Sequence, residues 1–77
     1  MEVRFKDLKP GEMAEVTGFD SSEKAYRSRL GAMGLTKGVE VMFIKSAPMG
    51  DPVEIEVRGY KLSIRKEEAE IVKMRRI

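Results

Sequence analysis

The segment from Val53 to Arg65 constrains the fold more than any other part of the sequence. A two-residue turn at Arg58-Gly59 makes every apolar side chain of one arm face an apolar side chain of the other. The facing pairs are Val57 and Tyr60, Ile55 and Leu62, and Val53 and Ile64, with Glu56 opposite Lys61 and Glu54 opposite Ser63 on the other side. A slip of one residue would destroy this agreement. The sequence therefore predicts an antiparallel hairpin in this register.

A second constraint is a helix end followed by a turn into a strand. Gly34 stands where a helix ends in a left-handed residue, a conformation that glycine adopts without steric cost. Leu35 then takes the position that contacts the helix again, and Gly38 marks a further turn. The helix itself is expected over Ser22–Met33, with a capping start at Asp20–Glu23.

One face of this helix carries Tyr26, Leu30 and Met33, with Arg29 beside them. So short a helix needs a sheet to hold it. The other expected elements are a strand or ordered arm over Met1–Asp7, strands over 13–18, Val39–Ile44 and Glu70–Arg76, and a helical turn at Lys66–Ala69.

These elements predict a mainly β protein with one domain over residues 1–77. Five or so short antiparallel strands favour a small barrel with a short helix inserted after an early strand. We expect the sheet to close, because closure removes unpaired edges.

Composition excludes several classes of function. Cysteine and histidine are absent, so disulfides, the usual zinc sites and Cys-His or Ser-His nucleophiles are impossible. No residue in the sequence stands out as a catalytic acid or base, so we do not expect an enzyme. The net charge of +2 is small for a nucleic-acid-binding protein. No apolar run approaches the ~20 residues of a membrane helix, and early charges are unlike a signal peptide. We expect a cytoplasmic protein without direct membrane insertion.

Three motifs together resemble the FeoA family of ferrous iron transport proteins, and the resemblance covers nearly the whole chain. The matching residues are Arg29-Leu30, Gly34-Leu35 and Gly38, then the segment 47–53, then Gly59, Leu62-Ser63-Ile64-Arg65 and Glu68-Ala69, with Leu8, Pro10 and Gly11 at the opening. The resemblance implies an SH3-like β-barrel with a helical insertion. It also implies an accessory role beside FeoB, the membrane ferrous iron transporter with a GTPase domain.

Two surfaces are candidates for binding the cytosolic portion of that transporter. The loop Ala47–Pro52 is pre-ordered by two prolines and offers Met49 as an adaptable apolar contact; its binding residues would be Pro48, Met49, Gly50, Asp51 and Pro52. The alternative is that the loop only connects two strands rigidly, with Met49 folded onto the core. On the helix, Tyr26 and Arg29 are the candidates, with Arg27 beside them. The alternative is that Tyr26 lies at the border of the core and that the stem of Arg29 covers the barrel.

Metal and nucleic-acid binding are the other possibilities. Weak candidates for Fe²⁺ or another divalent metal are the carboxylates Asp51, Glu54, Glu67 and Glu68, although exposed carboxylates select Fe²⁺ poorly. No other cofactor is expected. The basic end at Lys73, Arg75 and Arg76 keeps a nucleic-acid-binding barrel open as the alternative function. No aromatic platform interleaved with basic residues supports it, so nucleic acid is not the expected partner.

Overall fold

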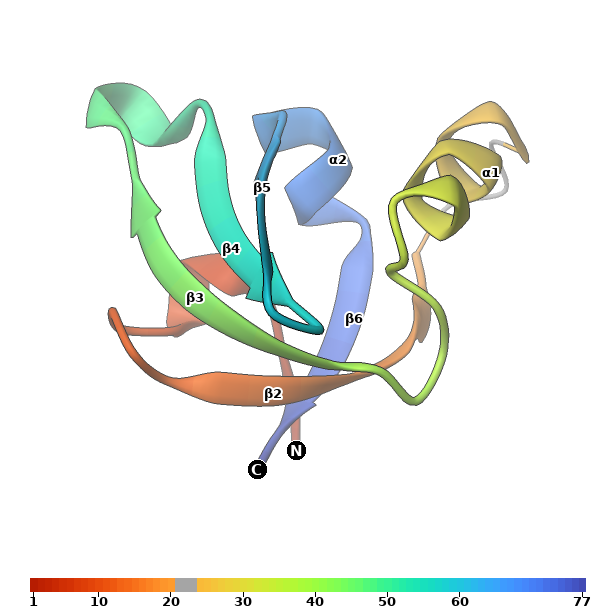
Figure 1. Ribbon diagram of the computed structural model, residues 1–77, viewed down its shortest axis with the longest axis horizontal. Coiled ribbons are helices and arrows are strands. Elements are labelled where there is room, and N and C mark those ends of the chain that lie inside the picture. The colour runs from red at the N-terminus through yellow and green to blue at the C-terminus, as the bar shows by residue number, and fades with distance from the viewer. Residues whose placement is uncertain (21–23) are drawn as a thin grey trace.

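The computed structural model describes residues 1–20 and 24–77, and it is mainly β (Figure 1). The elements in chain order are β1 (Glu2–Val3), η1 (Phe5–Asp7), β2 (Met13–Phe19), α1 (Lys24–Ala32), β3 (Glu40–Ser46), η2 (Pro48–Gly50), β4 (Val53–Val57), β5 (Tyr60–Ile64), α2 (Lys66–Glu70) and β6 (Val72–Arg76). The predicted helix start at 21–23 lies outside the described residues.

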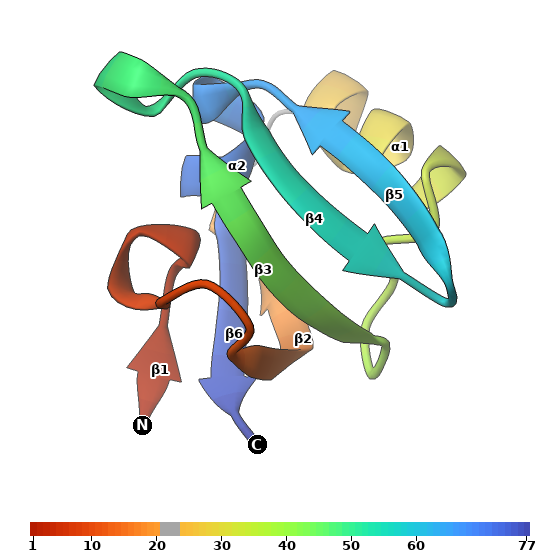
Figure 2. The same cartoon turned by 60° about the vertical axis from the view of Figure 1, so that its left-hand side comes forward.

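The strands form one antiparallel sheet in the order β1-β6-β2-β3-β4-β5, curled into a small barrel (Figures 1 and 2). The prediction of a closed sheet is wrong, because in the described part of the chain no ladder joins β5 to β1. The helix α2 is inserted between β5 and β6, and β1 has only two residues. In the described residues the two borders of the sheet, β1 and β5, are not paired with each other, and β5 keeps an open edge.

The first strand is shorter than the alternating pattern of Met1–Asp7 suggested. After Val3 the chain turns into the 3-10 helix η1, and Asp7 Oδ2 accepts a hydrogen bond of 2.9 Å from the Arg4 backbone N–H. This local side-chain bond offers the backbone an alternative to the sheet ladder. Phe5 is buried in the core from this turn.

The β4–β5 hairpin has the predicted turn and every predicted pair of facing residues. Arg58 (φ 52°) and Gly59 (φ 84°) are both left-handed, as in one of the two common types of two-residue hairpin turn. The apolar face is less uniform than its sequence, because Ile55 and Ile64 are buried whereas Tyr60 is 74% exposed. Tyr60 lies at the end of the hairpin, beyond the core.

The helix end also forms as predicted. Leu35 N–H donates to Leu30 O at 2.9 Å, and Gly34 N–H donates to Gly31 O at 3.0 Å. With Gly34 at φ 95°, this is the Schellman arrangement. Leu30 and Leu35 are both fully buried, so the helix is attached to the barrel at this point. The largest fully buried side chains around them are Ile55, Ile64, Met74, Val16, Val41 and Val72.

Candidate partner-binding site

Three segments that are separate in the sequence lie at the same end of the barrel. The loop 47–52 with η2, the helix α2 and the helix α1 follow one another along this end, and α2 stands between the other two (Figure 1). We call these three segments the rim. The two surfaces predicted for partner binding, the loop and α1, are thus parts of one face joined by α2.

The loop displays Met49 to solvent. Met49 has φ 71°, a left-handed conformation that is uncommon for a residue with a side chain, and it is 93% exposed. Hydrogen bonds from Gly50 N–H to Ala47 O (2.8 Å) and from Ala47 N–H to Pro52 O (3.0 Å) fix the backbone around it. The alternative in which Met49 folds onto the core is therefore wrong.

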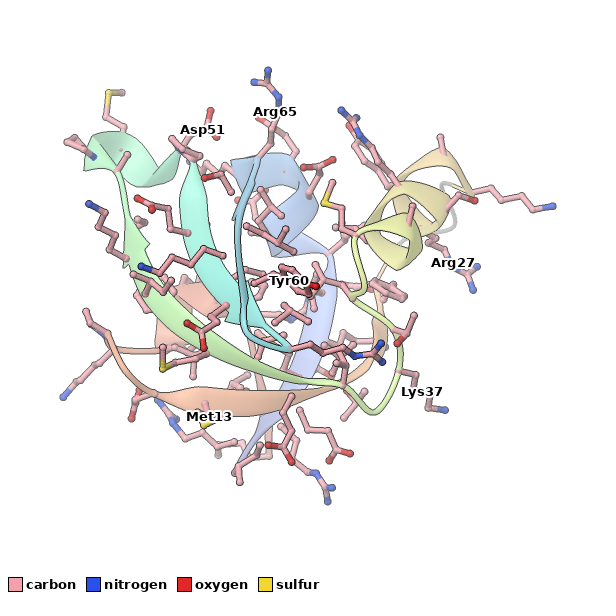
Figure 3. The ribbon with its side chains drawn as sticks, in the orientation of Figure 1. Met13, Arg27, Lys37, Asp51, Tyr60 and Arg65 are labelled. Carbon is pink, nitrogen blue, oxygen red and sulfur yellow. The ribbon has the colours of Figure 1, made fainter. Side chains whose placement is uncertain are left out.

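Asp51 attaches the loop to α2. Its Oδ1 accepts a hydrogen bond of 3.1 Å from the backbone N–H of Lys66, the first residue of that helix. The aliphatic stem of Lys66 lies over Gly50, with Cδ 3.9 Å from the position that a Cβ there would take. Figure 3 shows Asp51 and Arg65 at this end of the barrel and Met13 at the opposite end. The loop is thus held at its base while its tip stays free.

Arg29 attaches α1 to the same helix. Glu68 is only 2% exposed, its Oε1 accepts from the Arg65 N–H at 2.9 Å, and its Oε2 lies 3.3 Å from Arg29 Nε. Within the described residues Oε2 has no hydrogen-bond partner, so the Arg29 guanidinium is the charge that compensates it. The side chain of Arg29 is still 60% exposed and also faces solvent. Tyr26 is half-buried on this helix.

Sequence reasoning missed the burial of Glu68. The available signal was its position, because a glutamate three residues after a helix start returns its carboxylate to the backbone. That signal predicts the bond to Arg65 and not the ion pair, since Arg29 lies far away in the sequence.

Sequence reasoning also missed a groove beside the rim, with a volume of about 730 Å³. Its floor is apolar and its border carries lysines; the residues that matter are Phe5, Phe43, Val53, Lys6, Lys45 and Lys66. They come from η1, β3, β4 and α2, so no local pattern predicts their meeting. The groove shares Gly50 and Lys66 with the rim and extends its surface.

Arg4 also lines this groove. Its guanidinium donates to Glu70 O (2.8 Å), Glu2 Oε2 (2.7 Å) and Asp20 Oδ2 (3.1 Å). Burial lowers the pKa of this guanidinium, and the hydrogen bonds to the two carboxylates more than offset that effect, so the net pKa is raised. The charge of Arg4 is therefore compensated within the chain.

Comparison with known proteins identifies the family. The model of the FeoA domain matches residues 3–76. The chain belongs to the FeoA family. It is 28% identical over 67 residues to a Fe(2+) transport protein A/Fe(2+) transporter FeoB fusion protein of Porphyromonas gingivalis. That match covers 87% of this chain but only 8% of the fusion protein.

Solved structures agree with the FeoA assignment. A FeoA-like protein from Clostridium acetobutylicum is 30% identical, with a TM-score of 0.85, and the match covers 99% of this chain and 87% of that one. The fold is thus the SH3-like small barrel of FeoA proteins. A manganese-dependent transcriptional repressor has a TM-score of 0.89 at 6% identity, covering 99% of this chain and 37% of the repressor. This second likeness concerns the fold alone.

The carboxylates predicted as weak metal ligands in this FeoA-family chain have different surroundings. Asp51 accepts from Lys66, Glu54 lies 3.6 Å from Lys45 Nζ, and Glu68 is buried against Arg29. Across residues 1–20 and 24–77, no three acidic, histidine or cysteine side chains are grouped as a metal ion would need. A weak site for Fe²⁺ stays a prediction. No helix in the same residues is long and apolar enough to cross a membrane.

Proposed function

We propose that this chain is a non-enzymatic accessory of ferrous iron transport that binds the cytosolic portion of a FeoB-type transporter through the rim and regulates it. The observation that carries the proposal is the display of Met49, 93% exposed in a left-handed conformation on a loop fixed at its base. The fusion protein of Porphyromonas gingivalis supports the choice of partner, because it joins transport protein A to FeoB in one chain.

A fixed loop binds with little loss of conformational freedom. Pro48 and Pro52 restrict the backbone, and the bond from Lys66 to Asp51 holds it on α2. Met49 then supplies a flexible apolar side chain that adapts to a partner pocket. Tyr26 and the exposed part of Arg29 extend the contact onto α1. In this proposal Met49 and Tyr26 contact the partner, whereas Asp51 mainly positions the loop.

The test is the affinity of the purified chain for the cytosolic portion of the transporter, measured by calorimetry. Met49→Asp places a charge at the centre of the contact and is expected to weaken binding by about tenfold or more. Tyr26→Ala is expected to weaken it less. The matched control is Met13→Asp, the same change at a 42% exposed methionine at the opposite end of the barrel, which should bind within about twofold of wild type.

Two results would contradict the proposal in different ways. Absence of binding by the wild-type chain would remove the proposed function. Unchanged binding by both Met49→Asp and Tyr26→Ala would keep the function and remove the rim as its surface. Thermal unfolding of each variant shows that the fold is retained.

The nucleic-acid alternative has weaker support. Arg75 forms an ion pair with Glu15, and Arg76 Nη2 lies 3.3 Å from Glu12 Oε1. Both arginines of the basic end thus have carboxylate partners within the chain. A steep loss of RNA or DNA affinity with salt would nevertheless favour this alternative over transporter binding.

A further inference from the structure

The strand β5 forms one border of the sheet, away from the tip of the Met49 loop. In the described part of the chain its only hydrogen-bonded neighbour is β4. Figure 2 shows β5 at the border of the sheet, with no further strand beyond it. An edge of this kind presents backbone groups to whatever approaches it.

The hairpin register identifies those backbone groups. A two-residue turn with both residues left-handed makes Val57 and Tyr60 a hydrogen-bonded pair, and the pairs then alternate along the ladder. Lys61 and Ser63 stand in the non-hydrogen-bonded positions of the β4–β5 ladder. Their N–H and C=O groups therefore point away from β4, and no backbone bond elsewhere in the described residues uses them.

The side chains along this edge have one sign of charge. Residues 58–66 contain four basic residues and no acidic one. Lys61 and Ser63 alternate along the strand, Arg65 follows directly after it, and all three are exposed. Glu54 and Glu56 lie on β4, opposite Ser63 and Lys61, on the side of β5 away from the free edge. At the start of the strand, Tyr60 adds an aromatic ring that is 74% exposed.

We propose that the β5 edge binds an extended, acidic segment of a partner protein by strand addition. The segment would pair with the free N–H and C=O groups of Lys61 and Ser63, as added strands do. Its acidic side chains would lie beside Lys61 and Arg65, and an apolar one would contact Tyr60. This goes beyond the rim proposal, because it uses a different surface and backbone recognition.

Charge decides between an acidic partner and a second copy of this chain. Pairing β5 with β5 of another copy would bring two basic strands together, which is unfavourable. Lysine on an edge strand is also a known protection against strand addition. That protective role and our proposal make opposite predictions for an acidic peptide.

The experiment is a titration followed in the amide NMR spectrum of the full chain. The probe is a capped six-residue peptide that alternates glutamate and valine, and the control peptide alternates lysine and valine. The expected result is a set of shifts centred on residues 60–65, with slowed amide exchange at Lys61 and Ser63, for the acidic peptide only. Absence of localised shifts at millimolar peptide would overturn the proposal, as would equal binding of both peptides.

Two variants separate backbone pairing from simple charge attraction. Ser63→Pro removes an outward-facing N–H, and proline is tolerated at such edge positions; Ser63→Ala is the matched control. We expect Ser63→Pro to weaken peptide binding by about tenfold relative to Ser63→Ala. Equal affinities would overturn strand addition.

The double variant Lys61→Glu, Arg65→Glu changes only exposed side chains and protects the test against misfolding of the proline variant. It should reverse the preference, so that the lysine peptide binds more tightly than the glutamate peptide. Retention of the original preference would overturn the charge argument. Met49→Asp should bind the acidic peptide like wild type, which keeps this test independent of the rim.

Discussion

The two turns at the ends of β4 share one backbone feature and have different consequences. In each, a residue with a side chain adopts a left-handed conformation just before a glycine: Met49 (φ 71°) before Gly50 (φ 79°), and Arg58 (φ 52°) before Gly59 (φ 84°). A left-handed conformation costs about 1–2 kcal/mol for such residues. The backbone strain at Met49 and the backbone strain at Arg58 are therefore of similar size.

Hairpin geometry explains the strain at Arg58. In the two-residue turn found here both residues are left-handed, which matches the twist of the strands, and this turn sets the register of every β4–β5 pair. Met49 stands at the third position of a turn closed by the hydrogen bond from Gly50 N–H to Ala47 O, and this position also takes a left-handed residue. Its exposed side chain makes no contribution to the core. Both turns thus use the left-handed residue to connect two strands, and the Met49 turn in addition displays that residue on the rim.

The largest effect is expected at the centre of β4, which both turns share. Ile55 is fully buried, so Ile55→Ala should lower the free energy of unfolding by about 2–5 kcal/mol in chemical denaturation. Amide exchange at both turns should accelerate together, because both depend on this strand. Faster exchange at only one turn would show that β4 does not couple them.

The next effect concerns the base of the Met49 loop. Asp51→Ala removes the acceptor for the Lys66 N–H and should lower the free energy of unfolding by about 1 kcal/mol. It should also weaken transporter binding, because the loop is no longer held in one position. Unchanged binding with this loss of stability would show that Met49 is not positioned by Asp51.

A smaller and more direct test replaces the two strained residues by the same amino acid. Asparagine tolerates the left-handed conformation, so Arg58→Asn and Met49→Asn should each raise the free energy of unfolding by about 0.5 kcal/mol. Only Met49→Asn should weaken transporter binding in calorimetry. Equal binding by the two variants would remove the distinction between connection and display.

The smallest effect is expected at a third turn, Lys9–Glu12, in which the left-handed position is already a glycine, Gly11. The Lys9 backbone N–H donates to the Glu12 carboxylate at 2.7 Å, Arg76 donates as well, and both lower its pKa below the usual value. A lowered folded-state pKa means that the stabilisation is present at neutral pH and disappears as the pH falls through that pKa.

Thermal unfolding of wild type and Glu12→Gln from neutral pH to about pH 3 checks this prediction. Wild type should be slightly more stable at neutral pH, and the two midpoints should converge in acid. A constant difference over the whole range would assign the effect of Glu12 to packing and not to charge.

The parts of the fold that depend on neighbouring residues could be predicted from the amino-acid sequence. The alternation in Val53–Ile64 was sufficient for the complete hairpin register, because a period of two leaves one arrangement that buries the apolar side. The helix end was equally local, since Gly34 and Leu35 carry the whole signal. The exposed loop at Met49 was predicted as a contact surface from its prolines and glycine, although the sequence left its direction open.

Features that depend on distant segments became visible only in the three-dimensional packing of the chain. Glu68 was predicted as a surface carboxylate, and its burial depends on Arg29, 39 positions earlier in the sequence (68 − 29 = 39). The groove needs Phe5, Phe43 and Val53 from three elements. The open edge of β5 depends on how far the whole sheet curls. These features result from packing between segments, which local hydrophobic periodicity and turn residues do not encode.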